Sequence, residues 1–143
     1  MESGTFESDL RETLKKIPKK HQNLIKGWKF KAHPENTIKG DKKSCGLIDE
    51  KKKTITVASP WNYGREYTFL HEIGHLVWKY LMPEEKREKW AQTTEVIRSK
   101  NKKNKSLDQN DEELFCMAYA ASYCNQPVVA FDHDSWIDFI KKI

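Results

Sequence analysis

Two histidines and a glutamate interrupt an otherwise apolar segment, YTFLHEIGHLVWKY, at residues 67–80. The apolar residues of this segment recur at helical spacing and predict a helix. Residues i and i+4 of a helix lie on one face, roughly 6 Å apart at Cβ, so His71 and His75 can direct two imidazole nitrogens at one point. Zn²⁺ accepts imidazole nitrogen at about 2.0–2.1 Å, so the pair can share one ion. Glu72 projects about 100° round the helix from His71, where it can hold a water molecule beside the metal.

The spacing H-E-x-x-H is the signature of zinc metalloproteases. The residues that flank it are uncharged, so the helix can be buried and held rigid. Gly74 lies near the histidine face and costs about 1 kcal/mol relative to Ala in a helix interior. We interpret this glycine as the point where another element packs closely. The simpler alternative is a pair of buried histidines whose nitrogens are satisfied by hydrogen bonds alone.

A catalytic zinc site needs three protein ligands and one open position. The downstream residues that could supply the third ligand are Asp108, Asp111, Glu112, Glu113 and His133. We expect Glu113, because it begins an apolar helix in which small or soft residues follow on its own face. Such a helix can pack close to the histidine helix. Glu112, which shares a face with Tyr119 and Tyr123, is the second choice.

A different interpretation of Glu113 competes with the ligand role. Asn110 followed three residues later by Glu113 makes a capping box, in which the glutamate side chain serves the helix terminus. Asp111 and Glu112 can likewise be ordinary first-turn acids that interact with the helix dipole. The sequence leaves these interpretations open.

The arrangement of predicted elements indicates an α+β fold for residues 1–143, taken as one domain. We expect N-terminal helices that are interrupted near Pro18, followed by a strand at residues 28–33. A hairpin follows, with strands at Cys45 to Ile48 and Thr54 to Ala58, so we expect a short, mostly antiparallel sheet. The histidine helix should span about residues 65–81. Three further helices should follow, at residues 83–100, from residue 111 and at residues 134–143.

Charge and cysteine content limit the class of protein further. The formal net charge is +5, much of it in the run from Arg98 to Lys105. We interpret this run as a solvated loop, with contact to an acidic partner as the alternative. It lacks interleaved aromatic residues, so it does not favour nucleic-acid binding. The three cysteines form no CxxC pair, no apolar leader is visible and no apolar run reaches membrane-spanning length. These features predict a cytoplasmic protein without a membrane segment, with a secreted or virion-associated protein as the alternative.

The segments FLHEIGH and EELFCMAYAASY together resemble zincin metallopeptidases of the gluzincin type. The nearest likeness is to the anthrax lethal factor and Pro-Pro endopeptidase group, and the second is to the ImmA/IrrE family. The resemblance covers roughly residues 54–123. It implies a small zincin-like domain that holds one Zn²⁺ per chain through His71, His75 and Glu113. Glu72 would be the general base in the hydrolysis of a peptide or protein substrate.

Two positions depart from the lethal-factor pattern. That group has a second glutamate four residues after the ligand, where this chain has Met117, and a tyrosine in the preceding loop, where this chain has KNKSLDQND. The residue that would stabilise the oxyanion is therefore unassigned, with Tyr119, Tyr123 and His133 as candidates. These departures support a rival hypothesis, a catalytically inactive zincin-fold protein that acts as a binding or structural module.

Overall fold

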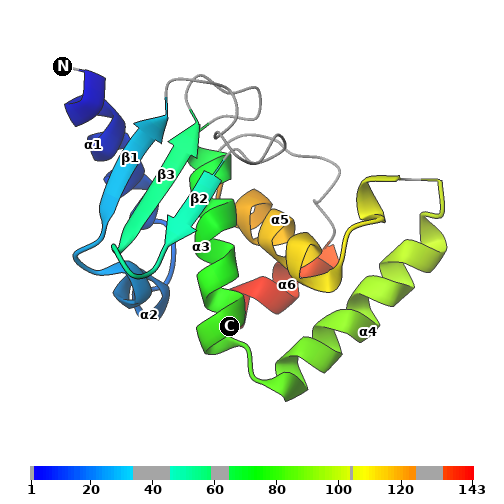
Figure 1. Ribbon diagram of the computed structural model, residues 1–143. Coiled ribbons are helices and arrows are strands. Elements are labelled where there is room, and N and C mark those ends of the chain that lie inside the picture. Colours follow the sequence, from blue (N-terminus) through cyan, green and yellow to red (C-terminus); the bar gives the residue numbers. More distant parts are fainter. Residues whose placement is uncertain (1, 34–45, 59–64, 104, 125–133) are drawn as a thin grey trace.

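The computed structural model describes residues 2–33, 46–58, 65–103, 105–124 and 134–143. Within these ranges six α-helices accompany a three-stranded sheet, which confirms the α+β class (Figure 1). The helices are α1 (Glu2–Leu14), α2 (Lys19–Gln22), α3 (Arg65–Leu81), α4 (Glu84–Lys100), α5 (Asp111–Tyr123) and α6 (Asp134–Lys141). The strands are β1 (Lys29–His33), β2 (Gly46–Asp49) and β3 (Thr54–Ala58), and two short 3-10 helices cover Asn23–Ile25 and Lys105–Leu107. Cys45, His133 and the predicted loop at residues 59–64 lie outside the described residues.

The sheet has the order β1-β3-β2, with β3 in the centre. The predicted hairpin is confirmed, because β2 pairs with β3 antiparallel and places Ile48 opposite Ile55. The expectation of a mostly antiparallel sheet is wrong, because β1 pairs with β3 in parallel, with Phe30 opposite Ile55. The chain enters β2 at the far edge after β1 and only then returns to the centre. Alternation of apolar residues predicts where strands lie, and it carries no information on their direction.

Helix α3 lies between the sheet and α5 (Figure 1). Its apolar stripe packs under the sheet, where Ile55 and Ile73 are fully buried. The rings of Phe30 in β1 and Phe69 in α3 meet edge to face, with centroids 4.9 Å apart. On the other side Gly74 faces α5 so closely that an added Cβ would lie 3.0 Å from the backbone of Cys116. The glycine therefore permits the close helix packing that the sequence predicted.

Tryptophan side chains build the core on the far side of α5. Trp90 in α4 stacks on Trp136 in α6, with centroids 5.5 Å apart, and meets Phe115 of α5 edge to face. Both indole N–H groups have partners, since Trp90 donates to the Asp111 carbonyl and Trp136 to the Thr94 hydroxyl. The bond from Trp90 attaches α4 to the first residue of α5.

Arg98 closes the connection between α4 and α5. Its guanidinium donates to the carbonyls of Leu107 and Gln109 and pairs with Asp111 at 3.2 Å. The first residue of the predicted basic run is thus part of the structure that fixes the start of α5. Lys100, Lys102, Lys103 and Lys105 are exposed. No helix in the described part of the chain has the length and apolar content that a membrane span requires.

Candidate metal centre

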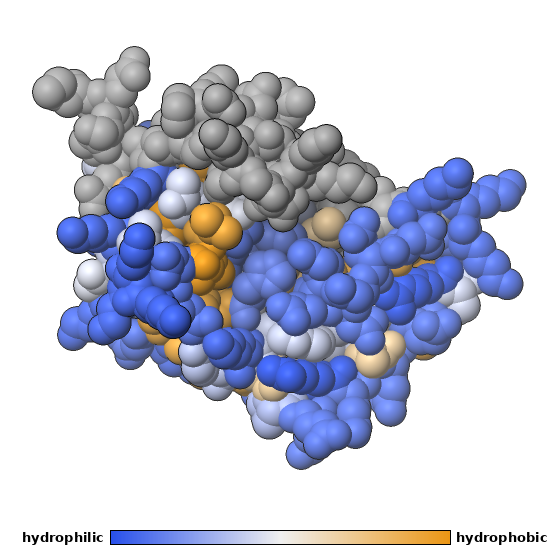
Figure 2. Space-filling view, in the orientation of Figure 1, coloured by the Kyte–Doolittle hydropathy of each residue, from blue (hydrophilic) through white to orange (hydrophobic). Residues whose placement is uncertain are grey.

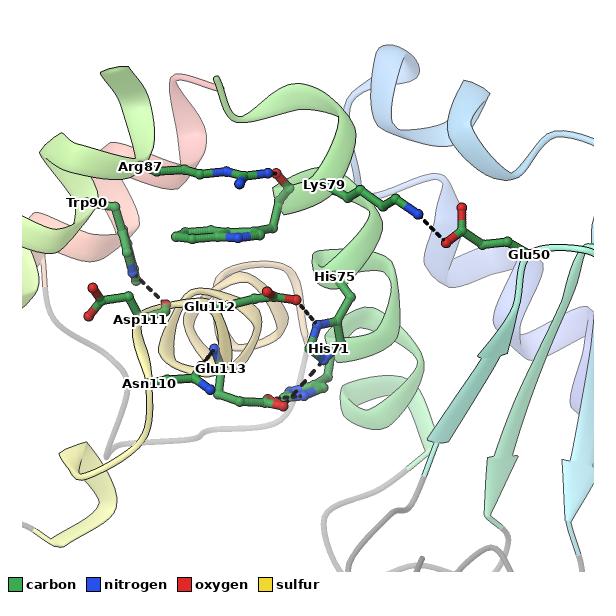
Figure 3. Close-up of polar contacts among 11 residues, drawn as sticks. Glu50, His71, His75, Lys79, Arg87, Trp90, Asn110, Asp111, Glu112 and Glu113 are labelled. Carbon is green, nitrogen blue, oxygen red and sulfur yellow. Dashed lines mark hydrogen bonds and ion pairs between the residues drawn. The ribbon is translucent and has the colours of Figure 1, made fainter. Parts of the chain in front are cut away.

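His71 and His75 lie one turn apart on the face of α3 that looks toward the start of α5 (Figure 3). Both histidines direct Nε2 at the carboxylate of Glu113. His71 Nε2 lies 3.0 Å from Glu113 Oε2, and His75 Nε2 lies 3.5 Å from Glu113 Oε1. Two ligand atoms of a tetrahedral zinc ion, each about 2.0–2.1 Å from the metal, are about 3.3 Å apart. The three side chains therefore fit the spacing and the donor chemistry of a zinc site.

Glu113 makes contacts through two different parts, its backbone N–H and its carboxylate. The Asn110 side chain accepts a hydrogen bond of 2.8 Å from the backbone N–H of Glu113, so Asn110 caps α5 as predicted. The carboxylate of Glu113 instead reaches across to the histidines. Capping sets the direction of the first turn and thereby aims this carboxylate.

The close charges shift the acid–base properties of the cluster. Hydrogen bonds from His71 and His75 hold the pKa of Glu113 well below its usual range. Burial alone lowers the pKa of His75, but its hydrogen bonds to Glu113 and Glu112 raise that pKa from 6.5 to about 9. In the metal-free protein His75 is therefore an imidazolium at neutral pH. A metal ion that binds there must displace this proton.

Glu72 lies beside the two histidines on α3 and packs against Gly46 of the edge strand β2. Burial raises the pKa of its carboxyl group, and this effect exceeds the opposing attraction of His71 and His75. An added Cβ on Gly46 would lie 2.6 Å from Glu72 Cγ, so β2 passes the glutamate at a distance that only glycine permits. A carboxyl group with a raised pKa exchanges protons closer to neutral pH, as a general base must.

An open groove of about 440 Å³ extends from this cluster along α3. Glu72 and His75 line it together with Ile48 and Glu50 on the β2 side and Arg87 on the α4 side. The Arg87 guanidinium lies over the Trp78 ring and donates to the Trp78 carbonyl at 2.7 Å, so it closes the groove wall. The groove therefore runs between β2 and the start of α4, with the histidine helix as its floor.

Glu112 also reaches the cluster, at a different atom. Its Oε2 lies 2.7 Å from His75 Nδ1, the ring nitrogen that points away from Glu113 (Figure 3). Sequence reasoning treated Glu112 as a rival ligand, and the structure gives it a separate contact. The signal available in the sequence was only the pair of consecutive glutamates at the start of α5.

Cys116, a buried residue of α5, is absent from the candidate ligands that the sequence predicted. Its thiol, with one nitrogen each of His71 and His75, forms a set of ligand atoms that all lie within 4.8 Å of one another. Burial and the nearby acids Glu113, Glu112 and Glu72 raise the pKa of Cys116, so without metal it is a neutral thiol. Its position one turn after Glu113, facing Gly74, could have indicated its place at the site.

The other sequence candidates lie elsewhere. Asp111 pairs with Arg98, and Asp108 is exposed in the preceding connection. Tyr119 is buried, with its hydroxyl 2.9 Å from His21 Nδ1, and Tyr123 is buried beneath Lys141 Nζ. The suggestion that either tyrosine stabilises an oxyanion is therefore wrong, because both belong to the core.

The aromatic residue that the described structure brings to the histidines is Tyr67. Its ring centroid lies 6.4 Å from that of His71, one turn earlier on α3.

The chain matches no protein-family model, no curated protein and no solved structure. Its function must accordingly be argued from the site itself.

Proposed function

We propose that this chain is a zinc-dependent endopeptidase with a zincin-like fold, whose single zinc ion is held by His71, His75 and Glu113. The observation that carries the proposal is the convergence of both Nε2 atoms on one carboxylate, at 3.0 and 3.5 Å. Two imidazoles and a glutamate leave one position of a tetrahedral ion open. Zinc bound there would lower the pKa of a water molecule toward ~7 and polarise a peptide carbonyl.

Glu72 is the general base of the proposed reaction. It accepts the proton of the attacking water and returns that proton to the nitrogen of the leaving amine, so the peptide bond breaks with one water consumed. Its half-buried position beside β2 supports this role, because burial raises the pKa of the carboxyl group. Glu72 stands outside the set of atoms that converge on Glu113, which suits a base and not a ligand.

The substrate is an extended peptide that adds along the side of β2 that does not face β3. In the described part of the chain β3 is paired on both sides, whereas β2 is paired on one side only. Figure 2 shows an apolar stripe over β2 between hydrophilic surfaces, and Leu47 of this strand is 50% exposed. A peptide bound along β2 would lie in the groove beside Glu72 and His75.

Cleavage of a peptide library by the purified protein, followed by mass spectrometry, tests the proposal. We expect zinc-dependent cleavage that a chelator abolishes and added zinc restores. Glu72→Gln should keep its zinc and its fold but lose at least a hundredfold in rate, because Gln cannot accept the proton. Cleavage at the wild-type rate by Glu72→Gln, or loss of its metal, would contradict the assignment of Glu72.

A second function is favoured by the thiol of Cys116. A zinc ion bound by His71, His75, Glu113 and Cys116 together would have four protein ligands, and closed sites of that kind are structural. The protein would then be a binding module, with the exposed lysines that follow α4 as its contact for an acidic partner. Such a protein binds zinc but cleaves no peptide, and Glu72→Gln changes none of its measurable properties.

A further inference from the structure

The imidazole of His75 has a different carboxylate at each of its two nitrogens. Glu113 Oε1 lies 3.5 Å from Nε2, and Glu112 Oε2 lies 2.7 Å from Nδ1. The two nitrogens of an imidazole point in diverging directions. A carboxylate that meets Nδ1 therefore cannot also occupy the point on which the two Nε2 atoms converge.

We propose that Glu112 is a positioning residue, which accepts a hydrogen bond from His75 Nδ1–H and so holds His75 Nε2 toward the metal. This role rests on the proposed zinc site. A proton fixed on Nδ1 leaves the lone pair of Nε2 free for the metal, and a negative partner makes the imidazole a stronger donor. The bond also restrains rotation of the ring, together with the contact between Nε2 and Glu113 and the edge-to-face packing on His71.

The surroundings of Glu112 are built to present it. The Glu112 side chain is 43% exposed, yet its carboxylate makes the short bond of 2.7 Å that charged partners form. The start of α5 is fixed by the Asn110 cap, by the ion pair between Arg98 and Asp111, and by the Trp90 bond to the Asp111 carbonyl. Glu112 and Glu113 thus extend from the same rigid turn of α5, Glu112 toward Nδ1 of His75 and Glu113 toward Nε2.

This arrangement bears on the departure from the lethal-factor pattern at Met117. That position holds a thioether in this chain, which is a weak acceptor and carries no charge. Glu112 nevertheless gives the site a second carboxylate, from the residue before the proposed ligand. A chain that lacks the second glutamate of the pattern therefore still has two acids at the histidines.

The alternative is that Glu112 is only a first-turn acid that interacts with the dipole of α5. The two roles differ in what they predict for zinc. A dipole contact affects helix stability and is shared by other acids near the helix start. A positioning contact affects the metal specifically, and outer-sphere partners of this kind typically change metal affinity by roughly 10–100-fold.

Zinc affinity, measured by competition with a chromogenic chelator, separates the roles without any need for peptidase activity. We expect Glu112→Ala to bind zinc 10–100-fold more weakly than wild type. Glu112→Gln retains a carbonyl acceptor, so its zinc affinity should lie between those of wild type and Glu112→Ala. Asp108→Asn removes one negative charge from the connection just before α5 and should leave the affinity unchanged. Circular dichroism verifies that all four proteins are folded.

The nuclear magnetic resonance spectrum of protein labelled with ¹⁵N-histidine supplies a second readout. Zinc-loaded wild type should show a protected N–H on His75 Nδ1, and this signal should exchange rapidly with water in Glu112→Ala. If wild type binds zinc and Glu112→Ala binds it as tightly as Asp108→Asn does, the positioning role alone is overturned. A wild-type protein that binds no zinc would overturn the metal centre together with this role.

Discussion

At the scale of single residues, His75 shows how one side chain serves two states of the site. In the metal-free protein it is held as an imidazolium between Glu112 and Glu113. In the proposed metal-bound state the same carboxylates have divided tasks, since one binds the ion and the other holds the ring. The proton on Nε2 in the first state occupies the place of the metal in the second.

The protonation of His75 makes the stability of the metal-free protein depend on pH. Its pKa is about 9 in the folded state against 6.5 in the unfolded chain, so the folded state binds the proton more tightly. This contribution is complete below pH 6.5 and is lost as pH rises toward 9, and it amounts to on the order of 2–3 kcal/mol. Urea unfolding in the presence of chelator should show the free energy of unfolding falling over that range. His75→Gln should flatten the fall, and a wild-type curve that is level or rising would contradict the shift.

The identity of the third ligand is decided by comparing Glu113→Gln with Cys116→Ala. We expect Glu113→Gln to weaken zinc binding by more than the roughly 10–100-fold that loss of an outer partner costs, because it removes a charged ligand. Cys116→Ala should bind zinc as wild type does. Chelator competition measures both affinities. The opposite pattern would make Cys116 the ligand, and loss in both variants would support the closed, structural site.

At the scale of elements, the site depends on how closely β2 and α5 approach α3. Glycine occurs at both approaches, with Gly46 against Glu72 and Gly74 against Cys116. Neither position has a positive φ among the described residues, so their role is one of space and not of backbone freedom. Gly46 sets where Glu72 can lie relative to a peptide on the strand edge, and Gly74 sets the distance between the helices that carry the proposed ligands.

Gly46→Ala should separate catalysis from metal binding. The new Cβ would lie 2.6 Å from Glu72 Cγ, so the glutamate must leave its rotamer or β2 must move. We expect peptide hydrolysis to fall by at least tenfold, since a displacement of about 1 Å in a catalytic group costs up to a hundredfold. Zinc content, measured by elemental analysis, should not change. Lys51→Ala changes an exposed residue of the turn that follows β2, outside the groove lining, and is the control that should leave Glu72 in place and the rate unchanged.

At the scale of the whole molecule, the proposed metal joins two helices that are far apart in the sequence. His71 and His75 belong to α3 and Glu113 to α5, with all of α4 between them. The connection is held by Arg98 and Trp90, so the fold brings the cluster together before any metal binds. An ion shared by both helices would add its binding free energy to their packing.

Zinc should therefore raise the thermal stability of the protein. At a free zinc concentration of 1,000 times Kd the stabilisation is about 4 kcal/mol, which corresponds to a rise in Tm on the order of 10 °C for a chain of this size. Differential scanning calorimetry with zinc and with chelator measures the difference. The His71→Ala, His75→Ala double variant should show no rise, and an unchanged wild-type Tm would refute a zinc site between α3 and α5.

The sequence by itself determined most local features of this protein. Helical periodicity predicted α3 from Arg65 to Leu81, and Asn110 with its acids predicted the start of α5, because these signals act within one or two turns of chain. The pairing of His71 with His75 also follows from spacing alone, since a helix has a single geometry. Gly74 marked a close approach because its cost within a helix requires a compensating contact.

Only the tertiary structure decided what depends on contacts between distant segments. Strand direction, the edge position of β2, the division of tasks between Glu112 and Glu113, and the presence of Cys116 beside the histidines are of this kind. Adjacent glutamates look alike in a sequence, and which one reaches which nitrogen depends on the packing of α5 on α3. Tyr119 and Tyr123 were candidates for the oxyanion role for the same reason, because their spacing from Glu113 could not show that both side chains are buried in the core.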